Sequence, residues 1–260
     1  MNNLPAVVEY LDKSEFHALA PAGVPSSRVL AGFSSAVNAS EKLRACTLDS
    51  LVDAAHDCSR LGLWPGPHGH VYLVPYGRTA TPIVGYKGMI ALAKRMTGAR
   101  IEARLVHEND EFSLSLGTDP RIEHVPASDR GACVGAYAVA RFPDGKTQFE
   151  HMTIDQVFAI RDRSPAKGDS PWTTDPGEMT RKTVVRRLCK YIGMDEGMGH
   201  AFAINDKAEG YGQGAPVTHK GGPRRNMMDA AARYSEPAPS TLMPPGADRP
   251  MDEAPEEVPF

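Results

Sequence analysis

The stretch from Gly62 to Arg95 constrains the fold of this chain most, because it combines a helix end, a hairpin and a helix start within 34 residues. Gly62 follows an apolar-periodic segment and Pro65 stands just beyond it, which is typical of a helix end. Apolar and polar residues then alternate from Val71, Gly77-Arg78 supplies a turn, and a second strand returns to Val84. The next segment, from Gly85, has the apolar period of a helix that ends near Gly98.

Further patterns predict more strands and two capped helices. Alternation predicts strands over 101–106, 112–116, 133–142 and 147–152, with turns at 117–120, 128–131 and 143–146. Thr153 followed by Gln156 forms a capping box that opens a helix to about Arg163. Thr47 is expected to cap another helix that ends at Gly62. The expected fold class is therefore α+β, with a twisted antiparallel β-sheet and hairpins backed by helices.

The two ends of the chain give weaker patterns. Prolines at positions 5, 21 and 25 argue against a long helix in the first 25 residues, and a short helix is expected over 28–37. Residues 164–174 are expected to form a polar loop that carries Trp172. Residues 207–260 are rich in glycine and proline and poor in large apolar residues, so we expect a disordered tail.

A basic helix follows Asp175, which is expected to act as its N-cap together with Pro176 and Glu178. One stripe of this helix is apolar, while the opposite side carries lysine and arginine at a spacing of four residues. No acidic residue lies between Arg181 and Lys190, so we expect these charges to be unpaired. Such a stripe is either a solvated face or a surface for an anion.

Composition limits the possible functions. The chain has 260 residues, of which 41% are hydrophobic, and a formal net charge of −3, so a polyanion would have to bind a local basic patch. Four dispersed cysteines without a CxxC pair indicate buried thiols in a reducing compartment. No basic stretch precedes a long apolar run, so we expect no signal peptide or membrane span and a cytoplasmic location.

Several segments, in the same order along the chain, carry a resemblance to a known family. They are Gly62–Pro65, Tyr72–Gly77, Gly85–Gly88, His107–Phe112, Gly135–Ala140, Ser170–Asp175 and Met179–Leu188. Together they resemble the RecT family of phage and prophage single-strand DNA annealing proteins over roughly residues 40–195. The resemblance implies ATP-independent annealing by a homo-oligomer, a ring or helical filament, in a bacterial host.

The candidate DNA-binding residues combine basic and aromatic side chains. Lys87 and the following helix start could hold a phosphate, with Tyr86 packing on a sugar or base and flanking glycines allowing close approach of a backbone. Trp172 is either a core residue or a stacking residue. The full set is Tyr76, Arg78, Tyr86, Lys87, Lys94, Arg95, Arg161, Trp172, Lys182, Arg186, Arg187 and Lys190.

Other chemistries have less support. His56, Cys58, His68 and His70 match no structural zinc spacing. Carboxylates around Asp110 leave a metal-dependent phage nuclease as an alternative, and a passive single-strand binding protein is another. The sequence has no phosphate-binding loop of the Gly-x-x-x-x-Gly-Lys-Ser/Thr type, no deaminase motif and no nucleophile elbow. We expect no catalytic residues, no bound metal and no required cofactor, with Mg²⁺ as a candidate modulator of DNA binding.

These patterns divide the chain into three parts. Residues 1–40 are expected to be a partly helical N-terminal extension with a role in subunit contacts, 41–206 the annealing core and 207–260 the tail. The tail ends in an acidic tip, residues 250–260, that resembles the tip of bacterial single-strand-binding proteins. The tip is either a solubilising segment or a ligand for the DNA groove or for host repair proteins. A phage exonuclease and host single-strand-binding proteins are further candidate partners, alongside single-stranded DNA and the annealed duplex.

Overall fold

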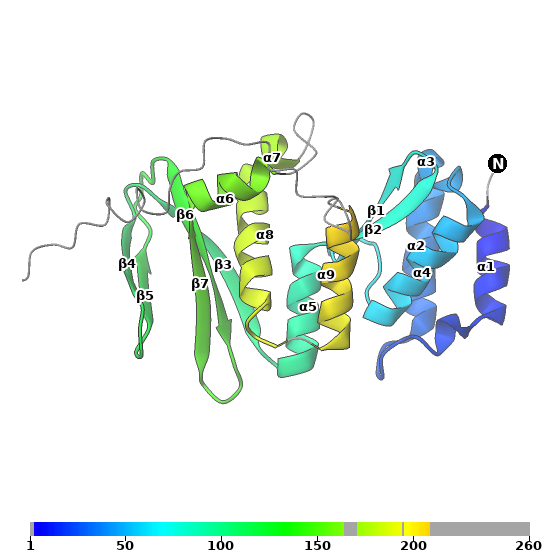
Figure 1. Cartoon of the computed structure of the whole chain (residues 1–260), viewed down its shortest axis with the longest axis horizontal. Coiled ribbons are helices and arrows are strands. Elements are labelled where there is room, and N and C mark those ends of the chain that lie inside the picture. The colour runs from blue at the N-terminus through cyan, green and yellow to red at the C-terminus, as the bar shows by residue number, and fades with distance from the viewer. Residues whose placement is uncertain (1–2, 164–170, 194, 209–260) are drawn as a thin grey trace, which may run out of the picture. The chain divides into compact units, whose positions relative to one another are not determined.

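The computed structural model describes residues 3–163, 171–193 and 195–208, all of which belong to one compact unit, residues 1–215. Its first part is helical (Figure 1). The helices are α1 (Leu4–Lys13), the 3₁₀ turn η1 (Glu15–His17), α2 (Ser26–Ala39), α3 (Glu41–Arg44) and α4 (Leu48–Leu61). Helix α1 differs from the expectation that Pro5 argues against a helix here. Proline is tolerated in the first turn of a helix, which is where Pro5 lies.

The Gly62–Arg95 stretch folds as its sequence predicts. Thr47 caps α4 through its side chain, and Gly62 ends α4 in the left-handed conformation, with φ 59°. Strands β1 (Val71–Tyr76) and β2 (Thr79–Val84) pair antiparallel, with Tyr76 opposite Thr79 across the turn. Helix α5 (Tyr86–Thr97) follows at once and ends at Gly98.

The main sheet has three antiparallel strands in the order β3-β6-β7. These are β3 (Arg100–His107), β6 (Cys133–Arg141) and β7 (Thr147–Thr153). A separate hairpin pairs β4 (Glu111–Ser115) with β5 (Arg121–Val125). The sequence predicted every one of these strands except β5, whose five residues are exposed or half-buried and carry only a short alternation.

Within the described residues, the sheet is followed by α6 (Ile154–Arg161), α7 (Pro171–Thr174), α8 (Pro176–Cys189) and α9 (Glu196–Ala208). Thr153 and Gln156 form the predicted capping box of α6. Helix α8 packs against all three strands of the main sheet, and α5 contacts both α8 and α9 (Figure 1). The short helix α7 occupies part of the expected loop, whose residues 164–170 lie outside the described residues, and α9 was not predicted.

A hydrophobic core joins the helices, the β1–β2 hairpin and the main sheet, and it includes the helices before residue 40. Two buried polar side chains reinforce it. Ser59 on α4 donates to the carbonyl of Phe16 at 2.8 Å. Asn205 on α9 accepts from the N–H of Val84 at 2.8 Å and donates to its carbonyl at 2.9 Å, so the buried amide satisfies both backbone groups of Val84 at the end of β2.

The predicted class, an antiparallel α+β fold backed by helices, is thus confirmed. Helix α9 includes the first two residues of the tail expected over 207–260, and the rest of that segment, with its acidic tip, lies outside the described residues. The proposed role of residues 1–40 in subunit contacts stays a prediction. No helix within the described ranges is both long and apolar enough to cross a bilayer.

Candidate nucleic-acid interface

The glycines around Tyr86 and Lys87 are required by the packing of the chain on itself. A Cβ on Gly85 would lie 2.3 Å from the carbonyl oxygen of Gly69, and one on Gly88 would lie 2.3 Å from that of His70. The N–H of Gly85 also donates to the His70 carbonyl at 2.9 Å. The loop before β1 is therefore pressed against the start of α5. The chain's own backbone thus makes the close approach that the sequence interpretation assigned to DNA, and the approach of DNA to these glycines stays a prediction.

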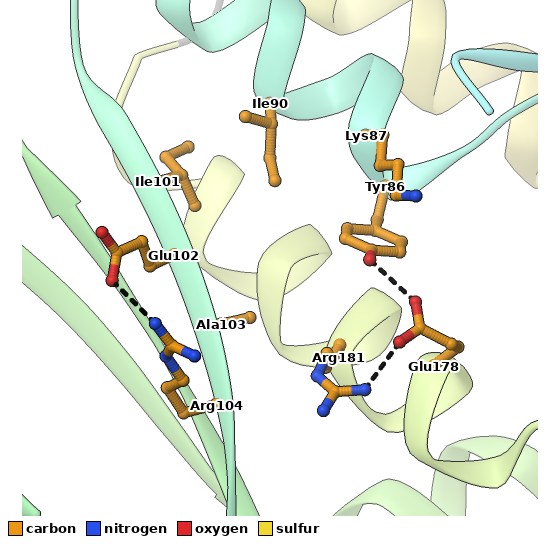
Figure 2. Close-up of a pocket in the computed structure, with 9 residues that line it drawn as sticks. All are labelled: Tyr86, Lys87, Ile90, Ile101, Glu102, Ala103, Arg104, Glu178 and Arg181. Carbon is orange, nitrogen blue, oxygen red and sulfur yellow. Dashed lines mark hydrogen bonds and ion pairs between the residues drawn. The ribbon is translucent and has the colours of Figure 1, made fainter. Parts of the chain in front are cut away.

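This packing places Lys87 exposed in the first turn of α5, next to the loop. Tyr86 precedes it and is half-buried, and its ring edge turns toward α8. The Tyr86 hydroxyl donates to Oε2 of Glu178 at 2.8 Å, while Arg181 Nη1 donates to Oε1 of the same carboxylate at 2.6 Å. Figure 2 shows the three side chains converging between α5 and α8. We call this group, Tyr86, Glu178 and Arg181, the α5–α8 bridge.

The bridge borders an open cavity of about 360 Å³ between α5, α8 and the edge strand β3. Its lining residues are Tyr86, Lys87, Ile90, Ile101, Glu102, Ala103, Arg104, Glu178 and Arg181. Because side chains alternate along a strand, Glu102 and Arg104 point to the other face of β3 from Ala103 (Figure 2). The cavity therefore has an apolar floor and a rim of Lys87 and the bridge.

Burial and the neighbouring Glu178 carboxylate raise the pKa of Tyr86 to about 12. The phenol is therefore a neutral hydrogen-bond donor at physiological pH. Together with Lys87 and Arg181 it offers donors to an anion, but Glu178 already occupies two of these donors.

Asp175 lies at the N-cap position of α8, but its side chain does not accept the expected hydrogen bond from the first turn of the helix.

Two arginines on the basic side of α8 are paired, contrary to the expectation from its sequence. Arg186 forms an ion pair with Asp206 of α9 and lies over the Phe202 ring, and its side chain is only 16% exposed. Arg187 pairs with Glu150 of β7 at 3.1 Å. Both partners lie far away in the sequence, which is why a count of acidic residues within the helix missed them. Lys182 is half-buried and Lys190 is exposed.

The other candidates occupy several elements. On the hairpin, Tyr76 and Arg78 are exposed. At the end of α5, Lys94 is exposed, whereas Arg95 donates to the carbonyl of Leu61 at 2.5 Å and so caps α4.

Two candidate DNA-binding residues, Arg161 and Trp172, follow the main sheet in the sequence. Arg161 pairs with Asp162 at 3.0 Å and covers the Phe158 ring. Trp172 is half-buried against the core, which favours the structural alternative for this residue.

Asp110 has a structural environment that argues against a nuclease. Its side chain is fully buried and accepts from Arg130 Nη2 at 2.6 Å and Nε at 3.0 Å, and from the N–H groups of His107 and Ala127. His124 Nε2 lies 3.0 Å away. The Arg130 guanidinium holds the pKa of Asp110 well below its usual range. Both carboxylate oxygens are saturated by protein donors, so neither is available to a metal ion.

The histidines and the cysteine weighed earlier as ligands belong to different surroundings. His68 and His70 lie in the loop before β1, with ring centroids 5.8 Å apart, and Cys58 is buried in α4. Within the part of the chain that the structure describes, no group of three or more His, Cys, Asp or Glu side chains could hold a metal ion.

Comparison with known proteins agrees with the ordered motifs. The RecT family model matches residues 27–210. Protein RecT of Escherichia coli (strain K12) is 36% identical over 227 residues, which cover 79% of this chain and 84% of that protein. The chain belongs to the RecT family. It is accordingly a DNA-binding recombination protein that anneals single strands.

The sequence prediction of DNA-binding residues did not include Glu178, Arg181 or Tyr72, which lie at the surface around the α5–α8 bridge and β1. Glu178 and Arg181 were assigned to the helix start and to the general charge of α8, since the contact between Glu178 and Tyr86 joins positions 92 residues apart. Tyr72 is 54% exposed on the same face of β1 as Tyr76. The alternation of β1 could have identified Tyr72, because it places the two tyrosines on one side of the strand.

Proposed function

We propose that this RecT-family protein anneals complementary single strands without nucleotide hydrolysis, as a homo-oligomer that holds the phosphate backbone and leaves the bases free to pair. Annealing requires no covalent chemistry. It requires that the repulsion between two backbones be reduced, which lysine and arginine side chains achieve by neutralising phosphates. Sequence specificity then comes from base pairing between the strands.

The observation that carries this proposal is the position of the Gly85–Gly88 segment. Its packing on the loop before β1 positions Lys87 and Tyr86 beside an open cavity, which Arg181 of α8 also lines. These groups can contact phosphate and sugar without reading a base edge. The chain also lacks a phosphate-binding loop, which supports annealing without ATP.

Annealing of two complementary labelled oligonucleotides, followed by fluorescence quenching, tests the proposal. We expect the full-length protein to accelerate annealing equally with and without ATP, and to leave end-labelled strands intact in Mg²⁺. A strict requirement for ATP would contradict the proposal. A protein that binds the strands but does not accelerate annealing would instead be a passive binder.

Oligomeric assembly and partner proteins follow from the same proposal. A repeated array of subunits would present the backbone contacts along a continuous track, in a ring or filament. We also propose contacts with a phage exonuclease and with host single-strand-binding or repair proteins, and Mg²⁺ as a modulator of DNA affinity. Negative-stain images without DNA, with one strand and with two complementary strands would test the assembly.

A further inference from the structure

Glu178 is an unexpected residue at this surface, because it brings a negative charge to a rim that is otherwise basic. It lies in the first turn of α8, where a carboxylate would ordinarily favour the helix N-terminus or take part in its cap. Its two oxygens instead accept from Tyr86 and Arg181 at 2.8 and 2.6 Å. The side chain is nevertheless 50% exposed, so solvent and ligands can reach it.

The donors that hold Glu178 are those that would hold a phosphate. A guanidinium binds carboxylate and phosphate oxygens with the same geometry, and a phenol hydroxyl donates to either. Lys87 lines the same cavity and adds a positive charge. A carboxylate held between these groups therefore occupies a position that suits a phosphate oxygen.

We propose that Arg181 and Tyr86 form a phosphate subsite for DNA, and that Glu178 is the internal carboxylate which a DNA phosphate displaces. This inference rests on the proposed function, since it assigns two contacts and one competing group to the backbone-holding surface. Glu178 weakens binding of a strand in two ways. It engages the donors in the DNA-free protein, and it repels the phosphate that replaces it.

This competition also suits the annealing reaction. The carboxylate is tethered beside its donors, so it can return as soon as a phosphate leaves. Release of one phosphate therefore does not leave Arg181 without a charged partner. The affinity for a strand is lowered while the contact stays reversible, which allows two strands to shift against each other until their bases match.

The test compares Glu178→Gln with Glu102→Gln in the full-length protein. Glu102 is a matched control, because its side chain is 53% exposed and also pairs with arginines, Arg104 and Arg141, each at 3.5 Å. Binding of a fluorescent oligothymidylate is measured by anisotropy over a range of salt concentrations. We expect Glu178→Gln to bind about fivefold more tightly at low salt. This factor corresponds to the repulsion between two unit charges about 5 Å apart in water, which the substitution removes. A smaller change is expected for Glu102→Gln.

A double-mutant cycle identifies the donor that Glu178 blocks. In an Arg181→Gln background, Glu178→Gln should yield less than half of its effect on the binding free energy, because the main donor is gone. Arg181→Gln alone should flatten the slope of log affinity against log salt by about 0.7. Tyr86→Phe removes one donor of the subsite and keeps the charge of Glu178, so this variant should bind the strand more weakly than the wild type.

Different results would overturn different claims. Unchanged or weaker binding by Glu178→Gln, or the same gain from Glu102→Gln, would overturn the displacement by phosphate while the wild-type protein still binds DNA. A full gain from Glu178→Gln in the Arg181→Gln background would show that Arg181 is not the blocked donor. Absence of single-strand binding by the wild-type protein would overturn the proposed function itself.

Discussion

Gly88→Ala tests whether the glycines near Lys87 serve the fold or the approach of DNA. The added Cβ would lie 2.3 Å from the carbonyl oxygen of His70, 3.1 Å from its carbonyl carbon and 3.0 Å from Cγ1 of Val84. The nearest atom belongs to the backbone, so relief requires the loop or the start of α5 to move. Forcing extra volume into a packed site costs about 1–3 kcal/mol.

The helix itself partly compensates for this cost, because alanine is favoured over glycine in a helix by up to about 1 kcal/mol. We therefore expect a net loss of about 1–2 kcal/mol in the free energy of unfolding. At about 2–4 °C per kcal/mol for a chain of this size, the melting temperature should fall by about 2–8 °C. Thermal denaturation of DNA-free protein, followed by circular dichroism, measures this shift.

Gly199→Ala is the matched control. Gly199 also lies near the start of a helix, α9, but a Cβ there would meet no atom within 4 Å. This variant should be as stable as the wild type or slightly more stable. If Gly88→Ala were equally stable without DNA and lost only DNA affinity, the glycine would serve DNA approach and our account of this segment would be wrong.

Three further predictions concern other regions. Asp110→Asn should flatten the fall of the free energy of unfolding below about pH 4. The pKa of Asp110 is lowered by folding, so this residue gives stability that is present above the unfolded-state pKa and lost as acid protonates the carboxylate. Acid titration of folding measures this loss, and the same loss of stability in acid for Asp110→Asn and the wild type would contradict the prediction. Lys190→Ala should lower the slope of log affinity against log salt by about 0.7 without a change in melting temperature. Arg186→Ala should lower the melting temperature, because it leaves Asp206 unpaired. Equal effects of the two variants on the melting temperature and on the salt slope would refute this difference between a DNA contact and a structural ion pair. Deletion of residues 250–260 should tighten single-strand binding, most clearly at low salt, if the acidic tip competes with DNA; unchanged affinity and unchanged capture of host repair proteins would make the tip a solubilising segment.

Local patterns predicted much of the fold because their causes are local. Thr47, Gly62 and the Thr153–Gln156 pair act within one turn of a helix, and the hairpin after Val71 is specified by alternation and by its two-residue turn. The same reasoning failed for α1, because a proline can begin a helix as well as interrupt one.

Prediction of side-chain pairing failed where the partner lies far along the chain. Glu178 and Tyr86 meet from different helices, and the acidic partners of Arg186 and Arg187 come from α9 and β7. A charge pattern within one helix cannot reveal such pairs, so the stripe on α8 was expected to be unpaired. The ordered motifs still identified the family, because they depend on residue types and order rather than on long-range contacts.

Binding of backbone-modified strands tests the central claim most directly. The claim is that the protein holds phosphates and leaves sequence recognition to base pairing. Affinity is measured for oligonucleotides of one length that differ in base composition, and for strands in which neutral methylphosphonates replace the phosphates. We predict similar affinities across compositions and a large loss with the neutral backbone, together with loss of the salt dependence. Strong preference for one base composition, or retained affinity for the neutral strand, would contradict the claim.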